Sequence, residues 1–460
     1  MPTALSQVLA LNWMKERLTP EGGLSVSNIN RNPYPEVTGY SIPTFLRSGE
    51  RSLATKMARW LVSKQGEDGS FPGIDGEPQV FDTAQVLRGI LAVQQEIPEA
   101  RKVSLRAASW MVSQIDGKTG AWTRSDAASW VGIPEAILLY AIRPLEEVIA
   151  IERGLPLDSR RLTRLKRYYI QRSQVQTNSH FLGYIAAGLF EIGLPNAARK
   201  AAHLPSRATW PGTSQLAEIY FRLGEWEMGE RLLRAMAQSQ QPDGGWTGGA
   251  PGYFEKEQIS WAPKFYLDAC ACMQQAWFQR TASAIPALIA AEDERVRTII
   301  GLLGELNGKR LLEVGCGKGR YLRHIQHRYP RCELYASDIS PELLRYLPAG
   351  VHSHPAPMSW LPYPEGYFDA VVCIEALEHA VFVQQALQEI RRVTRPGGRV
   401  IIVDKDNTAW GALPVAPWEQ WFGPGLLANS VKLAMDGGLF RAWYEDVPLV
   451  GERTTISKSQ

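Results

Sequence analysis

Hydrophobic positions in the first part of the chain recur at helical spacing. In the stretch that begins at Phe81, apolar side chains follow at positions 84, 86, 87, 90 and 91, on one face of a helix. The same pattern predicts twelve helices, at residues 4–18, 36–48, 50–64, 82–96, 100–114, 129–151, 158–173, 179–192, 195–203, 212–223, 226–239 and 257–279. Because no strong alternating pattern interrupts them, this part is predicted to be all-α.

The pattern changes after a linking helix near residues 292–306. Short apolar runs typical of strands occur in "KRLLEVGCG", "CELYASD", "FDAVVCIEAL" and "GRVIIVDK", and helical patterns separate them in "RYLRHIQHRY", "ISPELLRYL" and "VFVQQALQEIRRVT". This alternation predicts a mainly parallel sheet with helices on both faces, the Rossmann-like α/β class. With a link at 281–292, we expect two domains, residues 1–285 and 286–460.

Three connections in the first domain repeat one another. "RWLVSKQGEDGSF", "SWMVSQIDGKTGAW" and "RAMAQSQQPDGGW" each join an apolar helix to a Gly-containing turn and an aromatic residue, namely Phe71, Trp122 and Trp246. Trp122 follows Phe71 by 51 residues, and the 124 residues from Trp122 to Trp246 leave room for two further, degenerate units. This period fits a helical hairpin. Twelve helices then form six hairpins and an (α/α)6 toroid, in which Trp246 locks its turn onto the preceding helix.

These turns resemble the Gln–Trp motifs of prenyltransferase and squalene-cyclase repeats in the α/α-toroid superfamily. The acidic motifs DxDD and DDxxD of terpene cyclases are absent from the sequence. The segment "NPYPEVTGYSIPTFL" resembles the cleft-lining segments of carbohydrate-active toroids such as uronyl epimerases and lyases. The resemblance therefore implies a central cleft, and the missing motifs turn the expectation from terpenes towards glycans.

If the hairpins close a toroid, the starts of the inner helices face one cleft. The candidates there are Tyr34, Glu36, Tyr40, Asp82, Ser129, Trp130, His180, Tyr184, Gln258, Trp261 and Lys264. Carboxylates, a histidine and tyrosines in one cleft suit sugar binding or acid–base chemistry. Local explanations compete with this hypothesis, because Asp82 is also a candidate helix N-cap and Glu36 a favourable charge in a first turn. His180 stands alone in its stretch.

A glycine-rich turn opens the second domain. Gly315, Gly317 and Gly319 lie between a predicted strand and helix, where glycine lets a ligand approach the backbone and the helix offers free N–H groups. The spacing is neither that of dinucleotide binders nor that of a P-loop, because Gly319 follows Lys318 directly. Asp338 ends the next strand, 19 residues after Gly319, at the distance expected of a residue that binds a ribose diol.

The second domain resembles class I S-adenosylmethionine-dependent methyltransferases. The resemblance rests on "EVGCGKGRYL", "YASDISPELL", "SWLPYPEGYFDAVVCIEALEHA" and "EIRRVTRPGGRVIIVD". It implies S-adenosylmethionine as cofactor and S-adenosylhomocysteine as product. The cofactor-binding residues that it implies are Glu313, Gly315, Cys316, Gly317, Gly319, Asp338, Ile339, Met358 and Glu375. In this set Glu313 favours the cofactor's ammonium, Asp338 accepts from the ribose, Ile339 flanks the adenine and Met358 offers it a backbone N–H. Pro357 stands where many relatives carry an adenine-binding Asp.

His379 in "IEALEHA" is the best candidate for a general base, with Glu378 beside it. Imidazole titrates near neutrality, and this position follows a strand at the sheet edge where acceptors bind. The alternative is that both residues only order the loop or the cofactor's carboxylate. Glu375, Glu378 and His379 also resemble the E-x-x-E-H motif of metal-assisted quinone O-methyltransferases, which implies a divalent metal as a further alternative.

The segment after the last clear strand is predicted to contact the acceptor. Asp404, Asp406, Asn407, Trp410, Trp418 and Trp421 combine carboxylates, an amide and aromatic faces. That combination suits a glycan or another polar acceptor. A surface loop that packs its own tryptophans explains the same residues.

The composition and charge of the chain narrow the partners and the cellular compartment that we expect. The 460 residues carry a net charge of +3, which gives no case for a general nucleic-acid binder. The five cysteines are odd in number and mostly scattered, which predicts reduced thiols in a cytoplasm. The N-terminus lacks the features of a signal peptide, and no apolar run is long enough to span a bilayer. The oligomeric state does not follow from the sequence.

Three functional hypotheses remain. The leading one is an O-methyltransferase that modifies a sugar of a surface polysaccharide or glycolipid, while the toroid binds the glycan or modifies it further. The second keeps methyl transfer but makes the acceptor an isoprenoid, a quinone or another secondary metabolite. In the third, the toroid is purely a binding or assembly module.

Overall fold

The computed structural model describes residues 1–123, 133–152, 155, 157–203, 205–405, 416–420, 422, 440–446 and 455–459. It divides into two compact units. Unit 1 comprises Met1–Leu46 and Glu50–Met273, and unit 2 comprises Arg47–Gly49 and Gln274–Gln460. The division at residue 273 falls inside the long helix α12 (Trp261–Thr281), whereas the sequence-based boundary lies at residue 285.

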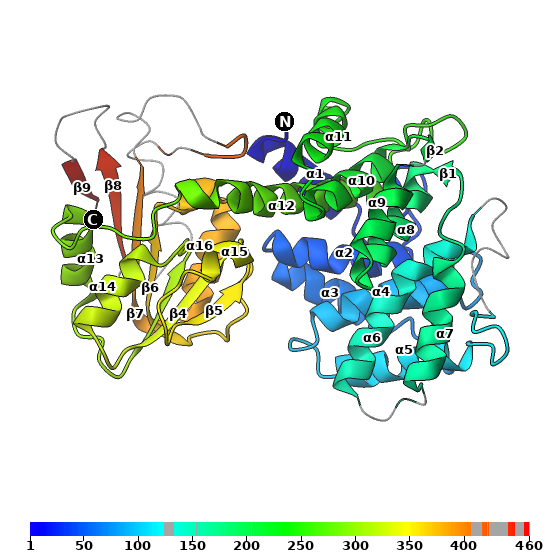
Figure 1. Cartoon of the computed structure of the whole chain (residues 1–460), viewed down its shortest axis with the longest axis horizontal. Helices are drawn as coiled ribbons and strands as arrows, with labels where there is room; N and C mark the ends of the chain where they lie inside the picture. The colour runs from blue at the N-terminus through cyan, green and yellow to red at the C-terminus, as the bar shows by residue number, and fades with distance from the viewer. Residues whose placement is uncertain are drawn as a thin grey trace. The chain divides into compact units, whose positions relative to one another are not determined.

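Unit 1 is built of helices, as its hydrophobic periodicity predicts (Figure 1). Before α12 they are α1 (Ala4–Lys15), α2 (Pro35–Arg47), α3 (Arg51–Val62), α4 (Val80–Ala92), α5 (Ala100–Ser113), the 3-10 helix η2 (Glu135–Ala141), α6 (Ile142–Ile151), α7 (Ser159–Ile170), α8 (Ser179–Glu191), α9 (Pro195–Ala202), α10 (Trp210–Arg222) and α11 (Trp226–Gln238). The sequence pattern missed one detail, a short parallel pair of strands, β1 (Thr177–Asn178) and β2 (Pro205–Arg207).

The aromatic residues of the repeated turns fold back onto the preceding helix. Trp246 is fully buried, and its Nε1 donates to the carbonyl oxygen of Met236 in α11 at 2.9 Å. Trp122 makes the equivalent bond to Met111 in α5, also at 2.9 Å. Phe71 is fully buried in the third turn. The two tryptophans thus bind the end of the preceding helix and all three rings are buried, so these residues are part of the scaffold.

Each of these turns also packs against a helix of another hairpin. The turns after α1, α3, α5 and α11 approach α3 at Lys56, α5 at Arg106, α7 at Arg164 and α1 at Leu9. At Gly244 the approach is so close that a Cβ would lie 2.3 Å from the carbonyl oxygen of Leu9, and its φ of 95° disfavours other residues. The glycine in the turn motif is therefore required by packing as well as by turn geometry.

A second set of helices packs side by side through glycines. Gly39 of α2 touches Gln85 of α4, Gly188 of α8 touches Leu139 of η2, and Gly212 of α10 touches the start of α8. α12 reaches α2 through a hydrogen bond from Thr44 Oγ1 to Asp268 Oδ1 at 2.7 Å. The first turns of these helices consequently lie near one another.

Unit 2 contains a seven-stranded sheet in the order β5-β4-β3-β6-β7-β8-β9. Its strands are β3 (Arg310–Val314), β4 (Glu333–Asp338), β5 (His352–Pro355), β6 (Phe368–Ile374), β7 (Thr394–Lys405), β8 (Phe440–Asp446) and β9 (Thr455–Ser459). All neighbours pair in parallel except β8 and β9, which are antiparallel. The predicted Rossmann-like class is confirmed for this unit.

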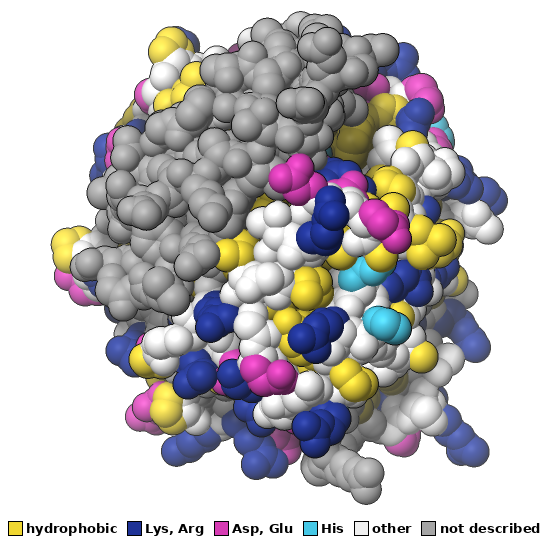
Figure 2. All heavy atoms as spheres, turned by 90° about the vertical axis from the view of Figure 1, so that its left-hand side faces the viewer, with side chains coloured by type: hydrophobic (Ala, Val, Ile, Leu, Met, Phe, Trp, Pro, Cys, Tyr) yellow, Lys and Arg dark blue, Asp and Glu magenta, His cyan; other side chains and the backbone are white. Residues whose placement is uncertain are grey.

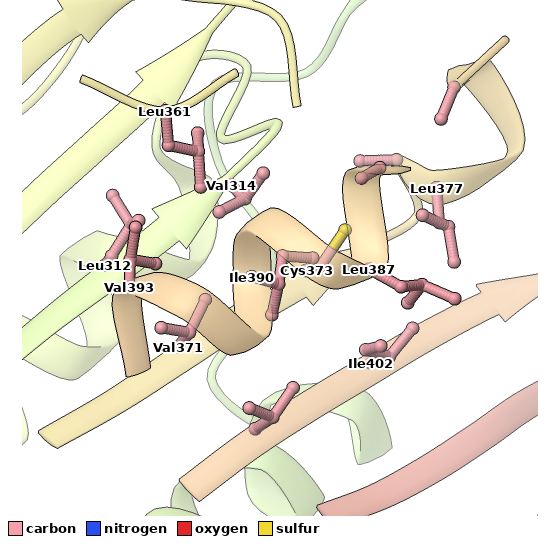
Figure 3. Packing of buried hydrophobic residues seen from close by; sticks show 14 of the residues in the cluster. Leu312, Val314, Leu361, Val371, Cys373, Leu377, Leu387, Ile390, Val393 and Ile402 are labelled. Carbon is pink, nitrogen blue, oxygen red and sulfur yellow. The ribbon is translucent and has the colours of Figure 1, made fainter. Parts of the chain in front are cut away.

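Helices cover both faces of the sheet, since residues of β6 alternate between two cores. Figure 3 shows one of them, in which Leu387 and Ile390 of α16 (Val383–Val393) pack over Val371 and Cys373. The opposite core joins α13 (Glu294–Leu303) and α14 (Arg320–Arg328) to Val372 and its neighbours on β6. The remaining helical pieces are η3 (Ala282–Ala284), α15 (Pro341–Leu344) and η4 (Leu377–His379). The apolar run of β6 is buried because helices cover the sheet on both of its faces.

The cysteines, the apolar character of the helices and the surface charge can each be compared with what the composition predicts. All five cysteines are free thiols, as their spacing predicts. Within the described part of the chain, no helix has the length and apolar character needed to cross a membrane. On the face drawn in Figure 2, Lys and Arg side chains lie scattered among acidic and hydrophobic ones, without a continuous basic stripe among the described residues.

Candidate functional site

The glycine-rich turn of unit 2 lies where the strand order reverses. β3 has β4 on one side and β6 on the other, and the turn leaves the carboxyl end of β3. The backbone N–H groups of Gly315 and Cys316 donate to the carbonyl oxygen of Ser337 at 2.8 and 3.1 Å. A Cβ on Gly315 would lie 2.4 Å from the Cβ of Ala376. The crevice at such a reversal is the usual ligand site of an open α/β sheet.

Asp338 ends β4 beside this turn. Its Oδ2 accepts from the backbone N–H of Gly317 at 2.9 Å and its Oδ1 from that of Ser340 at 2.9 Å. Burial raises the pKa of Asp338, and the two backbone donors oppose that rise. The carboxylate is therefore fixed in orientation, and each oxygen keeps a further lone pair for a diol.

Glu313 lies on β3 next to the turn and is only 1% exposed. Its Oε2 is buried and has no hydrogen-bond partner among the described residues. Burial raises its pKa to about 8, although Arg320 favours the ionised form. A buried, unpartnered carboxylate oxygen is costly unless a donor reaches it. This orphaned acceptor fits a cofactor that brings an ammonium group.

The remaining predicted cofactor residues surround the same turn. The buried Cys316 and the left-handed Gly317 and Gly319 form the turn itself. Ile339 follows Asp338 directly and is half-buried, and the Cε of Met358 lies 3.9 Å from the Cβ position of Gly315. Burial raises the pKa of the Cys316 thiol, so it stays protonated near neutrality. The geometry therefore unites these positions around one crevice.

Glu375 departs from the sequence-based expectation. Its Oε1 accepts from Arg295 Nη1 at 2.9 Å, and its Oε2 accepts from Arg320 and, at 3.2 Å, from the hydroxyl of Tyr321. It is one of two non-glycine residues with a left-handed φ in the described chain, at 50°. Two arginines already hold its carboxylate, and Glu375 is not among the three residues whose ligand atoms gather here, so this arrangement does not support the alternative in which Glu375 joins Glu378 and His379 around a metal. Arg295, on the linking helix, carried no sequence signal.

His379 lies between two carboxylates. Its Nε2 is 3.5 Å from Glu378 Oε1, and its Nδ1 is 3.3 Å from Glu419 Oε1. The backbone N–H of Glu378 donates to Asp404 Oδ2 at 2.9 Å, and that of Gln420 donates to the carbonyl oxygen of Glu378 at 2.8 Å. The loop is thus held from two sides. Sequence reasoning missed Glu419, whose only signal was its place beside Trp418.

Ligand atoms of Glu378, His379 and Glu419 all lie within 4.8 Å of one another. Two carboxylates and an imidazole are donors that divalent transition metals accept. The same arrangement also suits a histidine base whose protonated form two carboxylates stabilise. Glu419 thus takes the place beside Glu378 and His379 that the sequence pattern gave to Glu375.

Aromatic rings pack against His379. Phe278 meets its ring edge-on at 5.2 Å between centroids, and Trp277 lies 6.3 Å away. Trp418 lies 5.7 Å from Trp277, and both Trp418 and Asp404 are fully buried. Asp404 and Trp418 therefore support the His379 loop from inside and are not exposed acceptor contacts, which corrects that prediction. Asp406, Asn407, Trp410 and Trp421 lie outside the described residues.

The predicted cleft residues of unit 1 also gather. We call Glu36, Asp82, His180, Tyr184, Trp261 and Lys264 the inner cluster. Tyr34 donates a hydrogen bond to Asp82, and Glu36 is hydrogen-bonded to Tyr34 and Tyr184. The N-cap explanation for Asp82 is wrong, because α4 begins at Val80 and is preceded by Gln79. The cluster thus forms from helices that are far apart in the sequence.

Two of the remaining candidates behave differently. Tyr40 is buried under the inner cluster, with its ring 5.7 Å from that of Phe265. Gln258 instead binds Asp243 through Nε2 at 2.8 Å and lies 3.4 Å from Trp13 Nε1, so it supports the turn at residues 240–246. Its assignment to the cleft is therefore corrected. Ser129 and Trp130 lie outside the described residues.

Known proteins match unit 2. Residues 312–402 match the family model described as a methyltransferase domain. The ubiquinone/menaquinone biosynthesis C-methyltransferase UbiE of Bordetella avium is 27% identical over 171 residues, 34% of this chain and 64% of the relative. The O-methyltransferase cnsE of Penicillium expansum is 29% identical over 147 residues, 30% of this chain and 53% of the relative.

A solved S-adenosylmethionine-dependent methyltransferase from Mesorhizobium loti aligns at 19% identity with a TM-score of 0.27, covering 32% of this chain and 80% of that one. The chain spans 64% and 53% of the length of these two curated relatives. From the family-model match at residues 312–402 and the curated relatives, unit 2 carries a methyltransferase domain that uses S-adenosylmethionine.

Proposed function

We propose that the chain transfers the methyl group of S-adenosylmethionine to a hydroxyl oxygen of its acceptor. The observation that carries the cofactor assignment is the buried, unpartnered Oε2 of Glu313 beside the glycine turn. Bound S-adenosylmethionine supplies an electrophilic methyl group on its sulfonium. Glu313 then pairs with the cofactor's ammonium, Asp338 accepts from the ribose, and Ile339 and Met358 flank the adenine.

We assign proton removal to His379. Methyl transfer to oxygen requires that the hydroxyl proton move to a base as the new bond forms, and a positioned imidazole contributes about 100- to 10,000-fold to such steps. Glu378 and Glu419 on the two ring nitrogens support this role, since they stabilise the imidazolium that results. The aromatic rings of Trp277 and Phe278 limit access of water to this base.

Our leading acceptor is a saccharide hydroxyl from polysaccharide or glycolipid assembly. Carboxylates that accept from neighbouring hydroxyls and aromatic rings beside the base support this class. A phenol or quinol is the second candidate, and the aromatic rings of Trp277 and Phe278 beside His379 favour it, because a planar acceptor packs well against such rings. A quinone C-methyltransferase and an O-methyltransferase among the relatives agree with the second class.

We further propose that unit 1 is an (α/α)6 toroid. Support comes from the turn contacts that run from α1 to α3, α5 and α7 and from α11 back to α1. Contacts of α2 with both α4 and α12 support a second, inner ring of helices. In this arrangement the inner cluster occupies the centre of the unit.

The experiment offers methyl-labelled S-adenosylmethionine to the purified chain with two acceptor sets, saccharides from surface polysaccharides and phenolic quinols. We expect transfer to a saccharide that His379→Ala abolishes. Transfer only to the phenolic set replaces the saccharide proposal by the second candidate. Loss of activity on chelation, with recovery on adding Mg²⁺, Mn²⁺ or Zn²⁺, would assign Glu378, His379 and Glu419 to a metal. Failure to bind the cofactor at all would overturn the proposed function.

A further inference from the structure

The inner cluster of unit 1 lies outside the methyltransferase domain. Its residues come from the first turns of helices, Glu36 from α2, Asp82 from α4, His180 from α8 and Lys264 from α12. Asn178 caps α8 by accepting from the backbone N–H groups of His180 and Phe181 at 3.0 and 3.1 Å. The scaffold therefore holds these side chains on rigid elements, as binding sites require.

The two carboxyl groups of the cluster interact. Burial raises the pKa of Glu36 well above its usual range, and the charge of Asp82 raises it further. Tyr34 hydrogen-bonds both carboxyl groups. Burial and the neighbouring charge thus favour the neutral form of Glu36, which can donate a hydrogen bond, beside Asp82 as an acceptor.

His180 adds a free acceptor. It is only 5% exposed, and its Nδ1 lies 2.7 Å from Gln215 Oε1, which places the ring proton on Nδ1. Its Nε2 has no hydrogen-bond partner among the described residues. Burial lowers the pKa of His180 to about 4, so the ring is neutral at neutral pH. A neutral nitrogen without a partner, on a buried side chain among aromatic rings, can accept a hydrogen bond from a ligand.

One carboxyl group of the cluster is partly exposed. Glu36 is only half-buried, while Asp82 and Lys264 are buried. The cluster therefore meets solvent at Glu36. Next to it, Phe254 has a left-handed φ of 48°, and the neighbouring Tyr253 accepts a hydrogen bond from Trp261 Nε1 at 3.0 Å. Such backbone strain concentrates at ligand sites.

Charge decides which ligands fit. Aromatic faces beside carboxylates form a site for a cation, but Lys264 already occupies it, with its Nζ 3.7 Å from the ring centroid of Phe265 and 3.0 Å from Asp268 Oδ2. The three acidic groups Glu36, Asp82 and Asp268 outnumber the single lysine, which disfavours uronates and diphosphates. A purely apolar ligand would leave His180 Nε2 without a partner.

We propose that the inner cluster is a second ligand site and that it binds a neutral saccharide. A neutral sugar brings hydroxyl groups that donate to His180 and Asp82 or accept from Glu36, and C–H faces for Trp261 and Tyr184. The proposal does not depend on methyl transfer, because binding is measured without S-adenosylmethionine.

The test is an array of neutral, uronate-containing and sulfated glycans probed with the labelled full chain, followed by calorimetry on a neutral glycan that binds. We expect binding to neutral glycans, weakened at least about tenfold by His180→Ala, which removes a buried hydrogen bond. Asp82→Asn should weaken it similarly. The matched control is His203→Ala, because His203 ends α9 and contacts Tyr220 outside the cluster, and it should leave affinity unchanged.

A second measurement uses the unmodified chain, so that the proposal is tested even if the variants fail to fold. Diethyl pyrocarbonate labels accessible neutral histidines, and peptide mass spectrometry reports each position separately. We expect His180 of the unmodified chain to be labelled and the bound neutral glycan to protect it at least about fivefold. Binding to acidic glycans alone, no binding to any neutral glycan, or equal labelling of His180 with and without glycan would overturn the proposal.

Discussion

Unit 2 forms its candidate cofactor site from one strand–turn–helix segment and the ends of two adjacent strands, whereas unit 1 forms the inner cluster from the starts of helices that span residues 36–264. In unit 2 backbone N–H groups and glycines shape the crevice. In unit 1 side chains supply the polar groups. A local backbone site leaves a motif in the sequence, while a site assembled across helices leaves only scattered residues.

The two sites also share features. Each contains a buried side chain with an acceptor atom that has no partner among the described residues, Glu313 Oε2 in one and His180 Nε2 in the other. The only described non-glycine residues with a left-handed φ, Phe254 and Glu375, lie beside these two sites. Unmet hydrogen-bonding capacity and backbone strain therefore mark both places, although only one of them carries a motif.

We expect the largest effect in unit 2, because backbone groups and glycines form its candidate cofactor site. In Gly315→Ala the new methyl group would lie 2.4 Å from the Cβ of Ala376, and the φ of 68° strains it further. We expect affinity for S-adenosylmethionine to fall about 100-fold or more, as strain of a few kcal/mol requires. Calorimetry measures it. Gly308→Ala is the matched control, since Gly308 has a similar φ of 76° and open space around it; an equal loss there would point to general unfolding.

Within unit 2, a variant of the proposed base separates the rate of methyl transfer from the affinity for the cofactor. We expect His379→Ala to slow single-turnover methyl transfer by about 100- to 10,000-fold, while affinity for S-adenosylmethionine changes little. His327→Ala, an exposed histidine on α14, serves as control. Unchanged transfer in His379→Ala, or cofactor binding that falls in parallel, would reassign His379 to ordering the loop.

The raised pKa of Glu313 predicts that the affinity for S-adenosylmethionine depends on pH. The inner cluster takes no part in this binding. The pKa of Glu313 is raised from 4.5 to about 8, so the folded, ligand-free chain binds a proton that the ammonium of the cofactor must displace. Affinity for S-adenosylmethionine should therefore rise with pH up to about 8, by at most about tenfold per unit. Calorimetry in buffers of different ionisation enthalpy should detect proton release, and Glu313→Gln should abolish it.

The same shift has a consequence for stability. Between pH 4.5 and about 8 the folded state holds more protons at Glu313 than the unfolded state, so the free energy of unfolding falls as pH rises through this window. Glu313→Gln should flatten that part of the profile in denaturant titrations. A profile that is identical in both proteins would show that Glu313 is ionised in the fold.

The smallest effect concerns the scaffold of unit 1. Trp246→Phe keeps a ring in the buried position but removes the hydrogen bond to Met236, which should cost about 1 kcal/mol of unfolding free energy. Trp122→Phe removes the equivalent bond to Met111 and should cost a similar amount. Phe71 shows that the motif tolerates phenylalanine. Loss of glycan binding without loss of stability in Trp246→Phe would contradict its purely structural role.

The sequence predicted the helices of unit 1 and the strand–helix alternation of unit 2, because hydrophobic periodicity reports which face of each element is buried. It also predicted the gathering of Glu36, Asp82, His180 and Lys264, through the repeat that orders the hairpins. It could not show that Asp404 and Trp418 are buried or that Gln258 braces a turn, since these roles depend on packing partners distant in the chain.

What the sequence determined by itself is local: the turn from Gly315 to Gly319, the acid at Asp338 and the aromatic end of each repeated turn, where backbone conformation and spacing decide the structure. Tertiary structure alone decided that two arginines hold Glu375, that Glu419 joins His379, and that the Nε2 of His180 has no partner. Charge pairing and hydrogen-bond satisfaction depend on distances between segments, and one-dimensional spacing does not contain those distances.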